Sequence, residues 1–222
     1  MTHFTEELDR LHMKVMQMVV QTEQALSKTV NAFTRMDAEQ AQKVVDHDQE
    51  INKLEVEIDQ LCLRLLALEQ PVARDLRFIL GAMRLAKDLE RIGDEAANIS
   101  DATIFLSLHP SMEFYDQIQT MGQKAYDMLQ ESIIAFSSPD TEKAVEVCRL
   151  DFEVDEIHSE IMKVIINYMT QDNQTIEVCV QSINVARRFE RVADLATNIA
   201  ETTMFIVQGT SIKHTCQFDD RV

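Results

Sequence analysis

Hydrophobic residues recur every three or four positions over long stretches of this chain, which is the spacing of one face of an α-helix. The pattern predicts six long helices, at about residues 6–33, 38–67, 71–107, 112–136, 141–168 and 174–207. Asp37 suits the N-cap of the second helix, and we expect Pro71 in the first turn of the third. Short connections make successive helices antiparallel, so each set of three predicts an up-down-up bundle.

The second half of the chain repeats the first. Residues 86–99 match residues 186–199 at polar and apolar positions together, at an offset of 100. Upstream, residues 37–54 match residues 140–157 at an offset of 103. The change implies three extra residues in the first copy, between about residues 68 and 74, and such an insertion belongs in a loop.

We therefore predict an all-α fold made of a tandem repeat of two antiparallel three-helix bundles. The first bundle would span residues 1–108 and the second 109–208, with a polar tail over 209–222. Only four glycines and three prolines occur, which agrees with long helices and few turns that need special backbone angles.

The formal net charge of −17 narrows the classes of partner. Nucleic-acid binding needs clustered Lys and Arg, and none appear, so no nucleic-acid partner is expected. No apolar run approaches the roughly 18 residues of a membrane span, and no N-terminal signal pattern is visible. Four scattered cysteines without a CxxC pair indicate a cytoplasmic protein with reduced thiols, and Cys62 and Cys179 fall on core positions.

The third and sixth predicted helices carry the same acidic pair. Glu90 and Asp94 lie four residues apart, so they share one helix face, with the small Gly93 beside them. Glu190 and Asp194 occupy the matching positions of the second copy.

A parallel set of acids lies on the second and fifth helices: Asp48 in the first copy, followed one turn later by Asn52, and Asp151 and Asp155 in the second. If these helices pack antiparallel against the third and sixth, the acids face one another and repel unless a cation lies between them. Divalent metal or iron ions (Mg, Mn, Fe or Zn) would relieve that repulsion. The candidate ligands are Asp48, Glu90, Asp94, Asp151, Asp155, Glu190 and Asp194.

Two other interpretations stay open. Arg91 and Lys87 lie close enough along the helix to form ordinary ion pairs with these acids, which would make the protein a purely structural bundle without metal. A ferritin-like metalloprotein needs a Glu-x-x-His motif on each of two helices, and only Asp precedes His12 and His158 at that spacing. No phosphate loop or nucleophile motif is present, so we do not expect an enzyme.

Residues 70–77 read Gln-Pro-Val-Ala-Arg-Asp-Leu-Arg, and residues 88–94 read Asp-Leu-Glu-Arg-Ile-Gly-Asp. These motifs resemble those of the PhoU family of phosphate transport accessory proteins, and residues 186–201 resemble the family's second motif. The likeness covers about residues 5–207. The second copy lacks a counterpart of residues 70–77, so the two bundles present different surfaces.

The resemblance implies two three-helix bundles, usually as a homodimer in the cytoplasm. It implies a negative regulator of the phosphate-starvation response that couples the ATPase subunit of a phosphate ABC transporter to a sensor histidine kinase. It also implies metal ligation at the acidic positions named above, with Asp48 the weaker match because Asn52 follows it. A relative that serves another class of phosphate transporter would carry similar motifs.

Overall fold

The computed structural model describes residues 3–209 and shows no strand within them. The elements are α1 (His3–Arg35), α2 (Ala38–Glu69), α3 (Ala73–Leu106), α4 (Tyr115–Ser137), α5 (Thr141–Gln171), the short 3-10 helix η1 (Asn173–Thr175) and α6 (Ile176–Gln208). The predicted all-α class with six long helices is confirmed. Most of the predicted polar tail, residues 210–222, lies outside the described residues.

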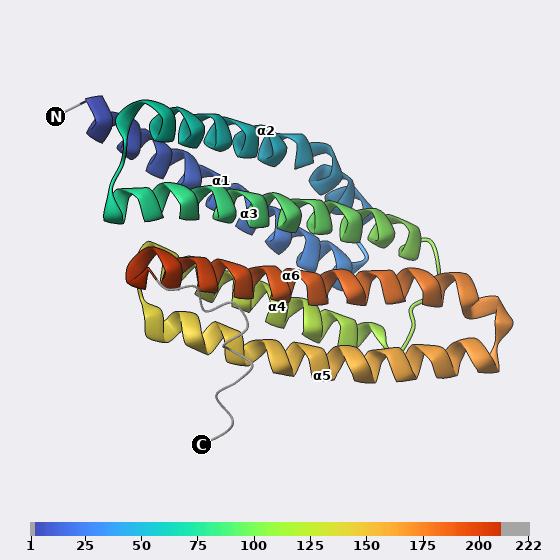
Figure 1. Cartoon of the computed structure of the whole chain (residues 1–222). Coiled ribbons are helices and arrows are strands. Elements are labelled where there is room, and N and C mark those ends of the chain that lie inside the picture. Colours follow the sequence, from blue (N-terminus) through green and yellow to red (C-terminus); the bar gives the residue numbers. More distant parts are fainter. Residues whose placement is uncertain (1–2, 210–222) are drawn as a thin grey trace, which may run out of the picture.

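The helices form two antiparallel three-helix bundles that lie side by side along their length (Figure 1). Within each half every helix packs against the other two. Between the halves, α3 packs against α6 and α1 packs against α4. The tandem arrangement expected from the internal repeat is therefore present.

The connection between α2 and α3 corrects one prediction. Pro71 does not lie in the first turn of α3, because that helix begins at Ala73 with Val72 as its N-cap. Residues 70–72 instead form the whole connection, and they are the three-residue insertion that the repeat implied. The second half makes the same turn with η1.

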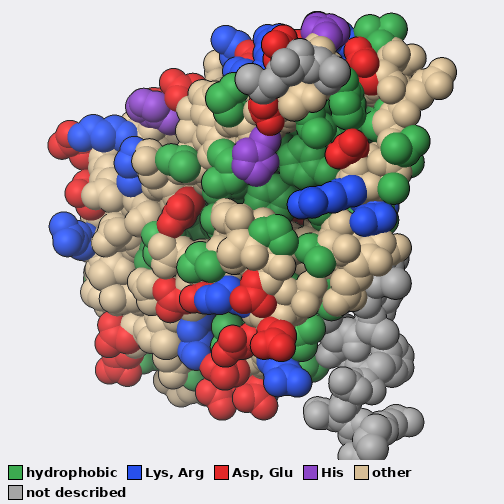
Figure 2. Space-filling model, turned by 90° about the vertical axis from the view of Figure 1, so that its left-hand side faces the viewer, with side chains coloured by type: hydrophobic (Ala, Val, Ile, Leu, Met, Phe, Trp, Pro, Cys, Tyr) green, Lys and Arg blue, Asp and Glu red, His purple; other side chains and the backbone are tan. Residues whose placement is uncertain are grey.

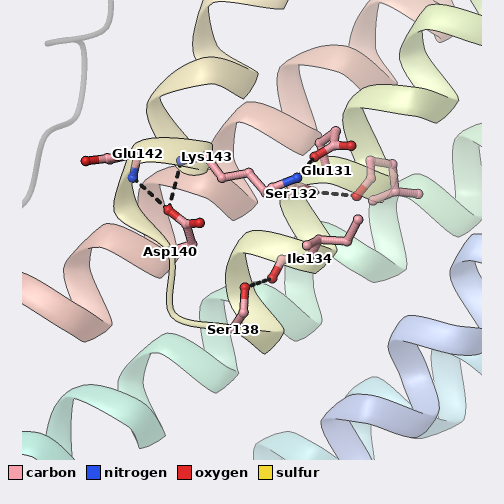
Figure 3. Close-up of polar contacts among 8 residues, drawn as sticks. Glu131, Ser132, Ile134, Ser138, Asp140, Glu142 and Lys143 are labelled. Carbon is pink, nitrogen blue, oxygen red and sulfur yellow. Dashed lines mark hydrogen bonds and ion pairs between the residues drawn. The ribbon is translucent and has the colours of Figure 1, made fainter.

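Side-chain caps fix the start of the second helix in each half. The Asp37 carboxylate accepts a hydrogen bond from the Gln40 backbone N–H at 2.9 Å. In the second half Asp140 accepts from the backbone N–H groups of Glu142 and Lys143 at 3.0 and 3.1 Å (Figure 3). Each bond satisfies a donor that the first helical turn would otherwise leave unpaired.

A single hydrophobic core runs through both halves. At its centre, the Phe33 ring of α1 lies 5.9 Å from the Tyr115 ring of α4 and 6.2 Å from the Phe189 ring of α6. Gly122 of α4 makes room for Phe189, because a β-carbon there would lie 2.7 Å from the ring. The predicted boundary near residue 108 falls in the connection between α3 and α4, and the division into two domains stays a prediction.

Two of the cysteines lie in the core, as the apolar pattern predicted. Cys62 and Cys179 are fully buried, as their positions in the apolar pattern predicted. Burial raises the pKa of the Cys62 thiol to about 12, so this thiol stays protonated. Across the described part of the chain, no helix combines the length and the hydropathy that crossing a membrane requires.

The close approach of α2 and α3 depends on a complementary pair of core residues. A β-carbon on Gly93 would lie 3.0 Å from Ile51 Cδ1, so Ile51 occupies the space that a larger residue would need. The repeat places Ala193 and Val154 at the corresponding positions, and both are buried. The second half thus has one carbon more on the third helix and one fewer on the second.

We predict that Gly93→Ala and Ile51→Val compensate for each other. Overpacking costs about 1–3 kcal/mol and Ile→Val about 0.5–1.5 kcal/mol, with part of the first offset by the better helix propensity of alanine. The double variant restores the packing of the second half. Its loss of unfolding free energy in urea should be smaller than the sum of the single losses by about 0.5 kcal/mol or more. Simple additivity would contradict this account of the interface.

Candidate metal centre

In the first half, the acidic residues of α2 and α3 face each other. The pKa of Asp94 is raised by burial first, then by the negative charges of Glu90 on its own helix and Asp48 on α2. A carboxylate of α2 is therefore close enough to oppose the ionisation of one on α3. Asp48, Glu90 and Asp94 share one helix interface, as the spacing predicted.

The second half holds a denser set of acids in the matching place. The pKa of Asp151 on α5 rises to about 7, because the side chain is buried and because Asp194, Asp155 and Glu190 lie nearby. The pKa of Asp194 is also raised, by partial desolvation of its carboxylate and then by Glu190 and Asp155, although the residue as a whole is exposed. The four predicted acids of this half thus act on one another across the interface of α5 and α6.

Ion pairs relieve only part of this repulsion. Lys87 Nζ lies 2.9 Å from a carboxylate oxygen of Glu90, which is the helical pair expected for a purely structural role. The ion pair of Arg91 is with Asp88, at 3.8 Å, rather than with Glu90 or Asp94 of the motif on the same helix. The Asn98 amide donates to the Asp94 backbone carbonyl at 2.7 Å, so this side chain forms a hydrogen bond within α3.

An ion pair that the sequence analysis missed links the two halves. Glu95 of α3 accepts from Arg188 and Arg191 of α6 at 2.7 and 3.2 Å. The sequence held a signal for it, because the repeat has Leu195 at the position of Glu95 and Asp88 at the position of Arg188. This departure from the repeat lies where α3 meets α6.

Unpaired buried oxygens test whether the acidic interface suits a cation. Asp48 Oδ1 and Asn52 Oδ1 are both buried without a hydrogen-bond partner, although the Asn52 amide donates to Asp48 Oδ2 at 3.0 Å. Buried acceptors without donors are costly, and hard cations bind carboxylate and amide oxygens. The donor set therefore fits a hard divalent cation or iron better than a soft metal.

The side chains are placed face to face without being gathered around one point. Among residues 3–209, no group of three or more His, Cys, Asp or Glu side chains is arranged so that it could hold a metal ion. His12 lies against the ring of Phe78 at 5.8 Å, and His158 Nε2 is buried without a partner.

The motif at residues 70–77 lies apart from these acids, at one end of the molecule. Its Arg77 donates to the Ile206 carbonyl of α6 at 3.1 Å and so satisfies an acceptor in the last turn of that helix. Arg74 and Asp75 line a cavity of about 340 Å³, which Phe78 and Phe136 also line. Figure 2 shows hydrophobic side chains in a hollow on this end, with charged side chains around it. The motif therefore joins the halves.

The raised pKa values predict an unusual pH dependence of stability. Between 3.8, the usual value for Asp, and about 7, folded Asp151 holds a proton that the unfolded chain has lost. Metal-free protein should therefore lose stability as the pH rises through this window. Asp151→Asn should flatten that loss in urea unfolding at about pH 5 and about pH 8 with a chelator present.

Glu160→Gln is the matched control, because Glu160 is an exposed acid of the same helix. The stability of this variant should fall with rising pH as that of the parent protein does. An equal decline in the Asp151→Asn variant would show that Asp151 titrates normally and that the acids of α5 and α6 do not repel one another.

Both halves of the chain match known proteins. The family model of the PhoU domain matches residues 6–103 and again residues 118–203, one match for each half. The chain is 35% identical over 209 residues to a phosphate-specific transport system accessory protein PhoU homolog from Aquifex aeolicus, covering 94% of this chain and 95% of the relative. It is 31% identical over 211 residues to the PhoU protein of Escherichia coli, covering 95% and 88% respectively.

Solved structures agree with the sequence relatives. The crystal structure of PhoU from Pseudomonas aeruginosa superposes with a TM-score of 0.90 at 34% identity, over 94% of this chain and all (100%) of that one. PhoU from Streptococcus pneumoniae, described as a phosphate transport system regulatory protein, gives 0.85 at 30% identity, over 94% and 99%. Sequence, internal repeat and fold agree over both halves, and we conclude that this chain belongs to the PhoU family.

Proposed function

We propose that this protein represses the phosphate-starvation response when phosphate is plentiful, as an adaptor between the ATPase subunit of a phosphate ABC transporter and a sensor histidine kinase. The observation that carries the proposal is the match to PhoU proteins along both halves, since those relatives are named as accessory proteins of phosphate-specific transport systems. The protein works in the cytoplasm, as a homodimer, and acts by binding rather than by catalysis.

Two features of the molecule support an adaptor. The long helices offer extended outer faces, and the halves differ where residues 70–77 have no counterpart, so two different partners can be told apart. At that end Arg74, Asp75 and Phe78 line the cavity of about 340 Å³ together with residues of the second half, so this surface is made by both halves.

Metal is the second part of the proposal. Asp151, Asp155, Glu190 and Asp194 would hold one or more divalent or iron ions in the second half, and Asp48, Glu90 and Asp94 would do so in the first. A bound cation supplies positive charge between helices that repel each other. These side chains then tie α2 to α3 and α5 to α6, which sets the shape of the surfaces that partners contact.

An indirect path for the phosphate signal follows from the charge. At −17, the molecule repels a free oxyanion at long range. Information on phosphate is therefore proposed to arrive through the partner proteins or through the bound metal.

Deletion of the gene tests the regulatory part. Without the adaptor, the kinase no longer receives the signal that phosphate is plentiful, so phosphate-starvation genes should be expressed constitutively in high phosphate. A transcriptional reporter for such a gene measures this, and re-expression of the intact protein should restore repression. Normal repression in the deletion strain would overturn the proposed function.

Substitution of one motif acid tests the metal part. Asp194→Asn keeps the shape of the side chain but removes a ligand charge, so the variant should retain less metal than the parent protein by elemental analysis after dialysis. Glu160→Gln, with the same change at an exposed position of α5, should retain the parent's metal.

Metal content, repression by the variant and oxygen consumption together separate the other two interpretations. A parent protein that carries no metal after growth with Mn and Fe, and an Asp194→Asn variant that still represses, would favour the purely structural adaptor. Oxygen consumption by the iron-loaded protein would favour the ferritin-like metalloprotein. The first result would contradict the metal part, and the second would contradict a protein that acts by binding rather than by catalysis. Both leave the deletion phenotype to decide the regulatory part.

A further inference from the structure

The cavity beside residues 70–77 lies at one end of the molecule, between the two halves (Figure 2). Its walls come from α1 and α3 of the first half, from the last turns of α4 and α6, and from the connection after α4. Apolar side chains form much of its lining, among them Leu8, Phe78 and Phe136. Small-molecule sites usually have volumes of about 300–1,000 Å³, so a cavity of about 340 Å³ suits a small ligand.

Three charged side chains at this cavity lack a partner of opposite charge. Asp9 of α1 and Arg74 and Asp75 of α3 all line it, and none of them forms an ion pair with another residue between positions 3 and 209. Carboxylates attract a protonated amine, and a guanidinium binds a carboxylate through charge-assisted hydrogen bonds. The cavity therefore offers partners for both charges of a zwitterion next to an apolar wall.

The opposite end of the molecule shows how the same fold closes this space. The repeat places Tyr115 where α1 has His12, and the Tyr115 ring lies 5.9 Å from Phe33. Phe33 corresponds to Phe136 of the cavity. The smaller His12 ring lies 5.8 Å from Phe78 of its own half, so the space that Tyr115 fills at the other end belongs to the cavity.

The charged side chains are also confined to the cavity end. At the opposite end the three corresponding positions are uncharged: Met112 for Asp9, Gln174 for Arg74 and Thr175 for Asp75. The two ends thus differ at one place in both free volume and charge. Each difference favours a bound ligand over a closed core.

We propose that this cavity binds a free apolar α-amino acid such as phenylalanine. The side chain of the ligand contacts Phe78 and Phe136, whose rings favour an aromatic group. Its ammonium group pairs with Asp9 or Asp75, and its carboxylate pairs with Arg74. The site is separate from the acidic motifs, and the proposal goes beyond the adaptor function without depending on it.

Titration of the full chain with L-phenylalanine, followed by NMR, tests the proposal. The backbone amide signals of Phe78 and Thr203 should shift and saturate, with half-saturation at about 1 mM or below. Those of Val178 and Thr103, at the corresponding positions of the other end, should stay in place. Phenethylamine lacks the carboxylate and 3-phenylpropionate lacks the amine, so each should bind roughly tenfold more weakly.

Two substitutions that install the residues of the opposite end test the assigned contacts. Arg74→Gln removes the partner of the carboxylate, so L-phenylalanine should bind roughly tenfold more weakly while phenethylamine binds as before. His12→Tyr brings to the cavity the ring that Tyr115 provides at the other end. All three probes should then lose their effect on the Phe78 signal.

Arg149→Gln is the matched control, because Arg149 is an exposed arginine of α5 that is not among the residues lining the cavity. It should bind every probe as the parent protein does. Circular dichroism of each variant confirms that it is folded.

Three outcomes would overturn the proposal. The first is a titration with L-phenylalanine that gives no saturable shift at Phe78 or Thr203. The second is an equal loss of phenethylamine binding in Arg74→Gln, since the arginine would then not act on the carboxylate. The third is tighter binding of a tripeptide that begins with phenylalanine, which would assign the cavity to the end of a peptide chain. None of them bears on the regulatory function, which the deletion strain tests.

Discussion

The antiparallel contact between α3 and α6 is the constraint on which the rest of the structure depends. Arg77 bonds to Ile206 near one end of this contact, and Glu95 bonds to Arg188 further along it. Both bonds imply the same register, which brings residues 90–94 of α3 level with residues 189–193 of α6. The two copies of the acidic motif therefore lie at one height of the molecule, each facing the second helix of its own bundle.

This arrangement concentrates negative charge where water is partly excluded. Burial is the largest cause of the raised pKa of Asp94, Asp151 and Asp194, and neighbouring acids come next. Basic residues oppose the shift of Asp194, one from its own helix, Arg191, and one from the other half, Arg91. The contact of α3 with α6 thus connects the electrostatics of the two motifs, because a charge on one half acts on an acid of the other.

Duplication followed by divergence explains why the halves share a fold and differ in chemistry. The core positions changed in compensating ways, as in the pair Gly93 and Ile51 against Ala193 and Val154. Glu95 changed without compensation inside its own half, because the arginines that it binds lie in the other half and Leu195 could not bind them.

The sequence by itself determined the helices, their order, the repeat and the acid pairs, because helical periodicity and capping are local and the repeat is a comparison of the chain with itself. The prediction that Pro71 lies in the first turn of α3 was wrong, because the start of that helix at Ala73 depends on the turn that precedes it. Only the tertiary structure decided that Gln21 and Asp48 line one cleft and that Glu95 meets Arg188. The residues of each pair lie about 27 and 93 positions apart, and which helix faces are brought together is settled by packing, which no local pattern encodes.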